Sequence, residues 1–211
     1  HRSQRRLICN PLFVPCVAEQ GAKEILMRFV SGIVAAVALA FGASAWAQSH
    51  NFGPAVGATL SAISAPDQTG ATRSLASLSG ENGTVLLVTR AADWCPYCQA
   101  QMIGLEGVRA EIEQRGYNIV TISTDTVEEL ARFQRRRNIG YTMLSDEQAQ
   151  IVRQLDLLDP TQPPNRRHNG LPVPTILILS PQDRVLAKLG DANFRVRPAP
   201  EVVVATLDGL R

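Results

Sequence analysis

The hydrophobic pattern predicts alternating strands and helices from about residue 84 to the end of the chain. Residues 84–89 are continuously apolar or β-branched, which is typical of a strand buried on both faces. Beyond them, apolar residues recur at helical spacing up to Gly116 and predict an amphipathic helix that opens near Cys95. The apolar positions of that helix are Met102, Leu105, Val108 and Ile112.

The same alternation continues through the second half of the chain. The turn at residues 180–183 joins two strands as a β-hairpin, and Pro200 opens a last helix. Because strands that alternate with helices form βαβ units, we predict an α/β fold in which helices flank a central mixed β-sheet. The expected strands cover residues 117–122, 142–145, 175–179 and 185–189, and the expected helices cover 127–137, 147–155 and a closing segment with Val203, Leu207 and Leu210 on one face.

The first 56 residues have a different character. Residues 1–26 contain prolines that interrupt any helix and precede Met27, so we interpret them as a non-native upstream extension. Residues 27–47 combine one positive charge, an apolar stretch and small residues before a cut site, which is the form of a secretory signal peptide. An uncleaved membrane anchor is the alternative. Residues 48–56 fit a polar tether, so we expect one domain over residues 57–211 and a periplasmic location, with membrane contact only through a retained leader.

Charge and cysteine counts narrow the possible functions. From Gln48 onward the chain holds 16 basic and 17 acidic residues, a net charge of −1, so no nucleic-acid partner is expected. Cys9 and Cys16 precede Met27, and a chain that starts there keeps only Cys95 and Cys98. Every thiol argument therefore rests on this pair.

Cys95 and Cys98 lie at the predicted start of the helix that follows the first buried strand. The free N–H groups and positive end of a helix stabilise a thiolate on the first cysteine, and the second lies one turn on, within reach of a disulfide. We therefore predict that Cys95 is a nucleophile open to solvent and that Cys98 is the resolving thiol. A zinc half-site would need two further ligands, and the chain from Gln48 onward has only His50 and His168 as candidates. A purely structural disulfide would stabilise the fold little, because it closes so short a loop. No metal and no cofactor are expected.

Two motifs resemble a known family. Trp94-Cys95-Pro96-Tyr97-Cys98 follows the first buried strand, and Val173-Pro174-Thr175 precedes a later one. From about Gly57 onward the chain resembles the redoxin branch of the thioredoxin superfamily, which holds the alkyl hydroperoxide reductase/thiol-specific antioxidant relatives and the exported thioredoxins. The resemblance implies a thioredoxin-like fold.

The resemblance also implies roles for the motif residues. Pro174 would be a cis-proline packed beside the disulfide, where it and Val173 guide an incoming substrate strand. Trp94 and Tyr97 are expected to flank the disulfide as a partly exposed apolar platform, with simple packing as the alternative for Trp94. Pro96 completes this substrate-binding set and, with Tyr97, matches the glutaredoxin type of motif.

The chain departs from these relatives close to Cys95. Typical peroxiredoxins have a Thr three residues before the peroxide-attacking cysteine, where this chain has Ala92. Thioredoxins have a buried acid six residues before the first cysteine, where this chain has Thr89. Asp93 is a candidate for proton transfer, with a plain loop carboxylate as the alternative, and its charge would raise the pKa of Cys95.

Three functions compete on these grounds. The leading hypothesis is dithiol-disulfide exchange between the Cys95–Cys98 pair and disulfide-bearing or dithiol proteins, with a membrane electron donor if the chain acts as a reductase. The alternative is a peroxiredoxin-like thiol peroxidase with Cys95 as the peroxidatic and Cys98 as the resolving cysteine. A third reading is copper binding by both thiolates and His168. The loop 159–172, which holds Arg166 and Arg167, is either a solvated connection or a docking element for a partner.

Overall fold

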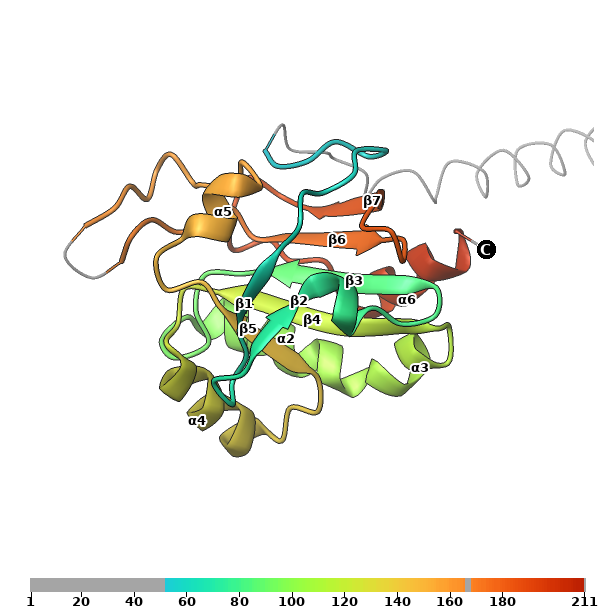
Figure 1. Cartoon of the computed structure of the whole chain (residues 1–211), viewed down its shortest axis with the longest axis horizontal. Coiled ribbons are helices and arrows are strands. Elements are labelled where there is room, and N and C mark those ends of the chain that lie inside the picture. Colours follow the sequence, from blue (N-terminus) through green and yellow to red (C-terminus); the bar gives the residue numbers. More distant parts are fainter. Residues whose placement is uncertain (1–51, 166–167, 211) are drawn as a thin grey trace, which may run out of the picture. The chain divides into compact units, whose positions relative to one another are not determined.

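A computed structural model describes residues 52–165 and 168–210 of the chain. Five strands form one sheet in the order β5-β4-β3-β6-β7, and two short strands pair separately (Figure 1). β4 is parallel to β3 and to β5, whereas β6 is antiparallel to β3 and to β7. The predicted mixed sheet is therefore confirmed. The strands are β1 (Ser64–Pro66), β2 (Thr72–Ser74), β3 (Gly83–Val88), β4 (Tyr117–Ser123), β5 (Thr142–Ser145), β6 (Thr175–Leu179) and β7 (Val185–Gly190).

The helices lie close to their predicted positions, with three differences. The helix expected to run up to Gly116 is broken at Val108, whose φ of −108° and ψ of 10° lie outside the helical range. The last helix buries Val203 and Leu207, but Leu210 lies beyond its end and is 38% exposed. The helices are η1 (Leu75–Leu78), α2 (Pro96–Gly107), α3 (Arg109–Glu113), α4 (Val127–Arg137), α5 (Gln150–Gln154) and α6 (Pro200–Asp208).

α5 starts three residues later than its expected start at Glu147. The buried carboxylate of Asp146 accepts hydrogen bonds from the backbone N–H groups of Gln150 and Val152, at 2.7 and 2.9 Å. Because free N–H groups at a helix start need acceptors, this side chain satisfies the first turn from outside the helix.

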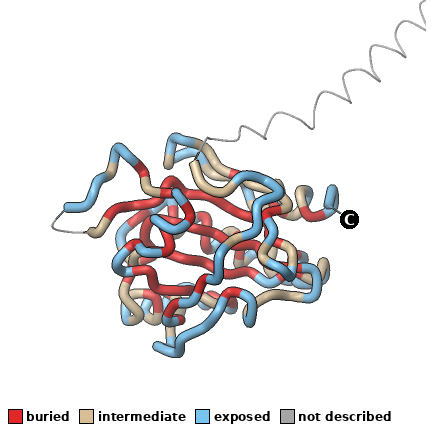
Figure 2. Tube along the Cα trace, turned by 45° about the horizontal axis from the view of Figure 1, so that its top comes forward, coloured by how far each residue is buried: buried red, intermediate tan, exposed pale blue. Residues whose placement is uncertain are grey.

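The sheet is buried on both faces, and its side chains alternate between two apolar clusters. Val85 and Leu87 of β3 face one cluster, which α2, α3, α4 and α6 cover, while Leu86 and Val88 face the other, which α5, β1 and η1 cover. This alternation follows from the two-residue repeat of a strand. Figure 2 shows the buried segments gathered in the strands and the exposed residues mostly in loops. All six residues of β3 are buried, as the continuous apolar run predicts.

The segment before β3 contributes more structure than the sequence predicts. The turn at residues 66–70 joins β1 and β2 as a small hairpin, and the Asp67 side chain accepts hydrogen bonds within it from the backbone of Thr69 and Ala71. Residues 52–56, from the segment interpreted as a tether, lie against the domain, since the Gly53 N–H donates to the Asp156 carbonyl at 2.9 Å.

Several sequence-based expectations lie outside the described residues. They are the upstream extension 1–26, the leader 27–47, the first part of the tether, and Arg166 and Arg167. Within residues 52–165 and 168–210, no helix is both long and apolar enough to span a bilayer.

Gly83 marks the start of β3 and provides a test of the fold. Its φ is +132°, and an added Cβ would overlap the backbone carbonyl of Leu179 on β6. We therefore expect Gly83→Ala to lower the free energy of unfolding by about 2 kcal/mol, measured by chemical denaturation. Gly107→Ala is the matched control: a Cβ there meets nothing within 4 Å, so the helix should gain up to about 1 kcal/mol. Equal effects at both glycines would contradict the register of β3 on β6.

Candidate functional site

Cys95 is the N-cap of α2, and Pro96 occupies the first turn. The Cys95 Sγ accepts a hydrogen bond from the backbone N–H of Cys98 at 3.4 Å. This N–H belongs to the first turn of α2, where the backbone N–H groups have no acceptor within the helix. The two cysteines form a disulfide, with their Cα atoms 5.3 Å apart. The predicted redox pair is therefore brought together at the positive end of a helix, where a thiolate on Cys95 is stabilised.

The expectation that Cys95 is open to solvent is wrong. Its side chain is 2% exposed and that of Cys98 is fully buried, because both pack into the apolar cluster together with Ala91, Ala92 and Met102. The sequence motif places a cysteine at a helix start but carries no information on what packs over it. A reactant therefore reaches the sulfur only through a narrow path or after neighbouring side chains move.

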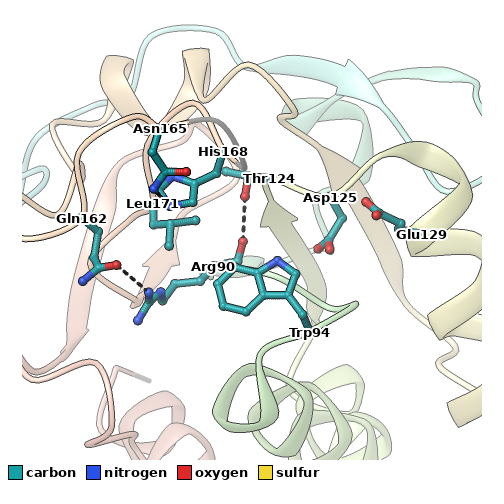
Figure 3. A pocket seen from close by; sticks show the side chains of 9 residues that line it. All are labelled: Arg90, Trp94, Thr124, Asp125, Glu129, Gln162, Asn165, His168 and Leu171. Carbon is teal, nitrogen blue, oxygen red and sulfur yellow. Dashed lines mark hydrogen bonds between the residues drawn. The ribbon is translucent and has the colours of Figure 1, made fainter.

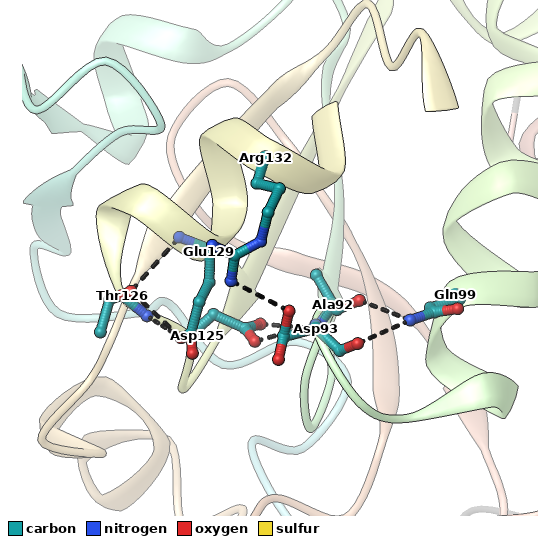
Figure 4. Close-up of polar contacts among 7 residues, drawn as sticks. All are labelled: Ala92, Asp93, Gln99, Asp125, Thr126, Glu129 and Arg132. Atoms are coloured by element: carbon teal, nitrogen blue, oxygen red, sulfur yellow. Dashed lines mark hydrogen bonds and ion pairs between the residues drawn. The ribbon is translucent and has the colours of Figure 1, made fainter. Parts of the chain in front are cut away.

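The loop that carries Cys95 is held from two sides (Figure 4). The buried carboxylate of Asp125, which follows β4, accepts the backbone N–H groups of Ala92 and Asp93 at 2.6 and 3.1 Å. On the other side, the Gln99 side-chain amide of α2 donates to the carbonyls of the same two residues at 2.8 and 3.0 Å. Burial raises the pKa of Asp125, and its hydrogen bonds oppose that rise. The backbone before Cys95 is thus fixed to both β4 and α2.

Asp93, the proposed proton-transfer group, has a structural partner instead. Its Oδ1 lies 3.1 Å from Nη2 of Arg132 on α4. This ion pair favours the alternative of a loop carboxylate.

An arginine and two aromatic rings form a layer beside the disulfide. Arg90 is 5% exposed, and its guanidinium lies 5.7 Å from the Trp94 ring centre and 4.2 Å from that of Phe194. Tyr97 meets Phe194 edge to face, with ring centres 6.0 Å apart. Burial lowers the pKa of Arg90, while the charge of Asp159 opposes that effect. Trp94 and Tyr97 are 53% and 42% exposed, and their role as a platform for a substrate stays a prediction.

A second arginine touches the resolving cysteine directly. Nη2 of Arg197 lies 3.5 Å from the Sγ of Cys98, and Nη1 donates to Oε1 of Gln101 on α2 at 2.8 Å. Its Nε also donates to the Phe194 carbonyl at 2.6 Å. Burial lowers the pKa of Arg197 to about 10, with the charge of Arg90 adding to the effect, so the group stays a cation at neutral pH.

A cavity of about 500 Å³ opens next to this layer (Figure 3). Arg90 and Trp94 form one side of it, and His168 faces them from the loop before β6. Burial and the charge of Arg90 lower the pKa of His168. The cavity is lined mainly by polar groups, and it adjoins the segment that leads into Cys95. The other lining residues are Thr124, Asp125, Glu129, Gln162, Asn165 and Leu171.

The expected cis-proline is wrong. No peptide bond within residues 52–165 and 168–210 is cis, so Pro174 follows Val173 through a trans bond. The trans form is the more stable one unless packing selects against it. Val173 is 1% exposed, its N–H donates to the Leu157 carbonyl at 2.8 Å, and its own carbonyl accepts from Thr175 Oγ1. The backbone N–H and carbonyl of Val173 therefore already have partners within the domain. Pro174 itself lies beside the carboxyl end of β3, from which the Cys95 loop starts.

The copper site is also not assembled. Among the described residues, no three His, Cys, Asp or Glu side chains come together as a metal site, so Cys95, Cys98 and His168 do not form one. The ring Nε2 of His168 instead lies 2.8 Å from the Asn165 side-chain amide. His168 therefore belongs to the cavity wall.

Four residues of this site were missed by the sequence reasoning: Arg90, Asp125, Phe194 and Arg197. A signal existed for the first two, because the carboxyl ends of the parallel strands β3 and β4 meet at one sheet edge, and both residues lie just beyond such an end. Phe194 and Arg197 lie in the irregular segment between β7 and α6, where no periodicity marks them.

Comparison with known proteins supports a redox site. A family profile described as "AhpC/TSA family" matches residues 56–188, more than half of the chain. Peroxiredoxin Bcp from Escherichia coli is 34% identical over 92 residues, which cover 44% of this chain and 58% of the relative. A 1-Cys peroxiredoxin from Triticum aestivum is 24% identical over 131 residues, which cover 59% of each chain. The chain thus spans somewhat under two thirds of the length of these curated relatives.

Solved structures share the fold. The crystal structure of peroxidoxin BcpB from Mycobacterium tuberculosis superposes with a TM-score of 0.63 at 24% identity, covering 77% of this chain and 99% of that one. A peroxiredoxin 6 mutant from Arenicola marina gives a TM-score of 0.66 at 16% identity, with 75% and 74% covered. At these identities the likeness establishes the thioredoxin-like α/β fold.

Proposed function

Because the chain belongs to the AhpC/TSA family, we propose that it is a thiol peroxidase in which Cys95 reduces a peroxide and Cys98 resolves the product. The observation that carries this proposal is the position of Cys95. Its sulfur accepts an N–H at the start of α2, lies in contact with a second cysteine, and is nearly closed to solvent. A helix start favours the thiolate, which is the reactive form.

The proposed reaction uses only these two sulfurs, a peroxide and a reductant. The Cys95 thiolate attacks the terminal oxygen of the peroxide, so that an S–O bond forms, the O–O bond breaks, and water or an alcohol leaves after protonation. The Cys98 thiolate then attacks the sulfenic sulfur, forming the disulfide and releasing hydroxide, which is protonated to water. A dithiol reductant returns both cysteines to thiols by exchange and is itself oxidised to a disulfide.

Burial of the pair favours this reading over exchange with protein substrates, the hypothesis that the sequence alone puts first. Hydrogen peroxide needs a path little wider than water, whereas a protein disulfide or a dithiol protein reaches the Cys95 sulfur only after the side chains that cover it move. The family comparisons also support a peroxidase better than a protein disulfide reductase.

Two observations keep disulfide exchange as the second candidate. Ala92 stands where typical peroxiredoxins have a threonine, so its position offers no hydroxyl to a peroxide. Trp94 and Tyr97 also present an exposed apolar surface beside the disulfide, and such a surface suits contact with another protein. A dithiol protein that regenerates Cys95 and Cys98 would use the same surface.

One pair of assays on the full chain separates the candidates. With dithiothreitol as the reductant, we expect consumption of hydrogen peroxide and little acceleration of insulin disulfide reduction. Rapid insulin reduction without peroxide consumption would reverse the order of the two functions. A sample with both cysteines alkylated is the control for reaction of the reductant with peroxide alone.

We also propose that the enzyme works in the periplasm, on the strength of the leader-like segment 27–47. Its reductant would then be a dithiol protein that receives electrons from a membrane donor. Cell fractionation of the native host checks this location, and recovery of the chain in the cytoplasm would contradict it.

A further inference from the structure

Arg197 contacts Cys98 directly, with its Nη2 3.5 Å from the Cys98 Sγ. The guanidinium is held in place by two acceptors, the Gln101 side chain and the Phe194 carbonyl, and neither is charged. Among the described residues, the structure assigns no ion pair to Arg197, so its positive charge is uncompensated by a carboxylate. A half-buried cation kept 3.5 Å from a sulfur instead suits a sulfur that becomes an anion.

The neighbouring arginines act in the same direction, while the carboxylate of Asp159 opposes them at Arg90. Arg90 lies close enough to Arg197 to lower its pKa, and Arg195 in turn lowers that of Arg90. Gln101, the neighbour on α2 that contacts Arg197, is neutral, and Asp93 on the far side of the loop is paired with Arg132. The charge in contact with Cys98 is therefore the Arg197 cation, and the positive end of α2 acts in the same direction.

We propose that Arg197 is a further catalytic residue, whose guanidinium holds Cys98 as a thiolate in the reduced enzyme. The inference rests on the proposed function for the step that this thiolate performs. In that step Cys98 attacks the sulfenic sulfur of Cys95, a reaction that only the thiolate carries out.

The same contact assigns the direction of regeneration. A thiolate of the reductant attacks Cys95, and Cys98 departs with the electron pair of the broken S–S bond. Because the thiol of lower pKa leaves faster, the cation beside Cys98 makes it the better leaving group. The mixed disulfide therefore forms on Cys95, next to the exposed Trp94.

The first test measures the Cys98 thiol itself and needs no peroxide. In the full chain with Cys9, Cys16 and Cys95 replaced by serine, the pH dependence of thiolate absorbance reports the pKa of Cys98. Arg197→Met is expected to raise that pKa by about 1 to 3 pH units, since it removes the adjacent positive charge.

Arg195→Met is the matched control. It removes the same charge from the same segment, but its guanidinium is exposed and lies 4.8 Å from the Phe194 ring centre. We expect the Cys98 pKa to change by a few tenths at most, because solvent screens the exposed charge. Arg197→Lys, which keeps a positive charge, should restore part of the effect.

The second test measures the rate at which Cys98 closes the disulfide, in the chain that keeps both Cys95 and Cys98. After peroxide addition to the chain with Trp46 replaced by phenylalanine, Trp94 fluorescence should change in two phases, sulfenic acid formation and disulfide closure. Arg197→Met should leave the first phase unchanged and slow the second about tenfold. The measurement is made at a pH below the Cys98 pKa of the parent chain, where a pKa rise of two pH units removes about 99% of the thiolate and the greater basicity regains roughly tenfold in nucleophilicity.

Two results would contradict the proposed role of Arg197. An unchanged Cys98 pKa in Arg197→Met, or equal effects of Arg195→Met, would overturn the role of Arg197. If Arg197→Met does not fold, Gln101→Leu replaces it: the guanidinium loses an orienting acceptor, and the pKa should rise by a smaller amount in the same direction. A clear pKa effect in a chain that consumes no peroxide would refute the peroxidase function and leave Arg197 as the group that activates Cys98 for disulfide exchange.

Discussion

Replacing Cys95 by serine is expected to abolish peroxide turnover, with a loss on the order of 10³-fold or more, because the attacking sulfur is removed. Cys98→Ser should act differently. The first equivalent of peroxide should still be reduced, and a sulfenic acid should then accumulate on Cys95, since no second thiol lies beside it. Single-turnover peroxide consumption and dimedone labelling measure the two steps separately.

Both variants belong in a background in which Cys9 and Cys16 are serine, so that thiols outside the described residues do not contribute. The two variants should unfold at nearly the parent's denaturant midpoint under reducing conditions, which serves as the control for folding. Loss of the first turnover in Cys98→Ser, together with its retention in Cys95→Ser, would exchange the roles of the two cysteines.

Asp125→Ala is expected to lower the free energy of unfolding by about 3 kcal/mol, the largest stability effect near the site. The Asp125 carboxylate accepts the N–H groups of Ala92 and Asp93 and the Ser123 hydroxyl, and the side chain is 2% exposed. Buried donors that lose their acceptor cost about 1–3 kcal/mol each, partly offset by relief of the desolvated charge. Urea denaturation measures the change.

Asp93→Ala provides the comparison, because it removes a carboxylate from the same loop. That group makes a surface ion pair with Arg132, and such pairs contribute under about 1 kcal/mol. Equal losses in the two variants would contradict the role of Asp125 as the acceptor that fixes the loop.

The pH dependence of stability gives an independent check on Asp125. Burial raises its pKa in the folded chain above the ordinary value of 3.8, so the folded state holds the proton more tightly than the unfolded state. Its contribution to stability is therefore greatest below that value and is lost as the pH rises through the raised pKa. Asp125→Asn should remove this decline, and an unchanged pH profile would show that the carboxylate is not desolvated.

The sequence predicts best those helices and strands whose local signals, such as caps and apolar runs, agree with their place in the folded chain. α4 covers residues 127–137 as expected, because Thr126 and Glu129 form a capping box at its start and Asn138 ends it in the left-handed conformation. β3 and β6 are continuous apolar runs with turns on either side, and both lie in the middle of the sheet.

The Cys95–Cys98 pair was predictable for a similar reason. A strand, a short loop and a helix start are all visible locally, and together they place the first cysteine at the N-cap. The burial of Cys95 was not predictable, because it depends on packing against side chains from elsewhere in the chain. The cis-proline followed only from resemblance, and the bond between Val173 and Pro174 is trans in the structure.

Arg197 shows the limit of local reasoning most directly. It lies 99 residues from Cys98 in sequence, and no spacing rule connects the two. The connection is topological: β7 runs antiparallel to β6, which runs antiparallel to β3, so the end of β7 returns to the edge where the Cys95 loop begins. The segment after β7 therefore enters the site only once the sheet order is known.

The location of this segment determines where the chain can be shortened without damage to the site. The match to the family profile ends at residue 188, whereas Arg197, which contacts Cys98, comes later. A shortened form ending with the sheet would keep both cysteines but lose this cation and α6, whose Val203 and Leu207 belong to the same apolar cluster as the disulfide. Expression of the matched region alone would therefore leave the redox pair in an incomplete core.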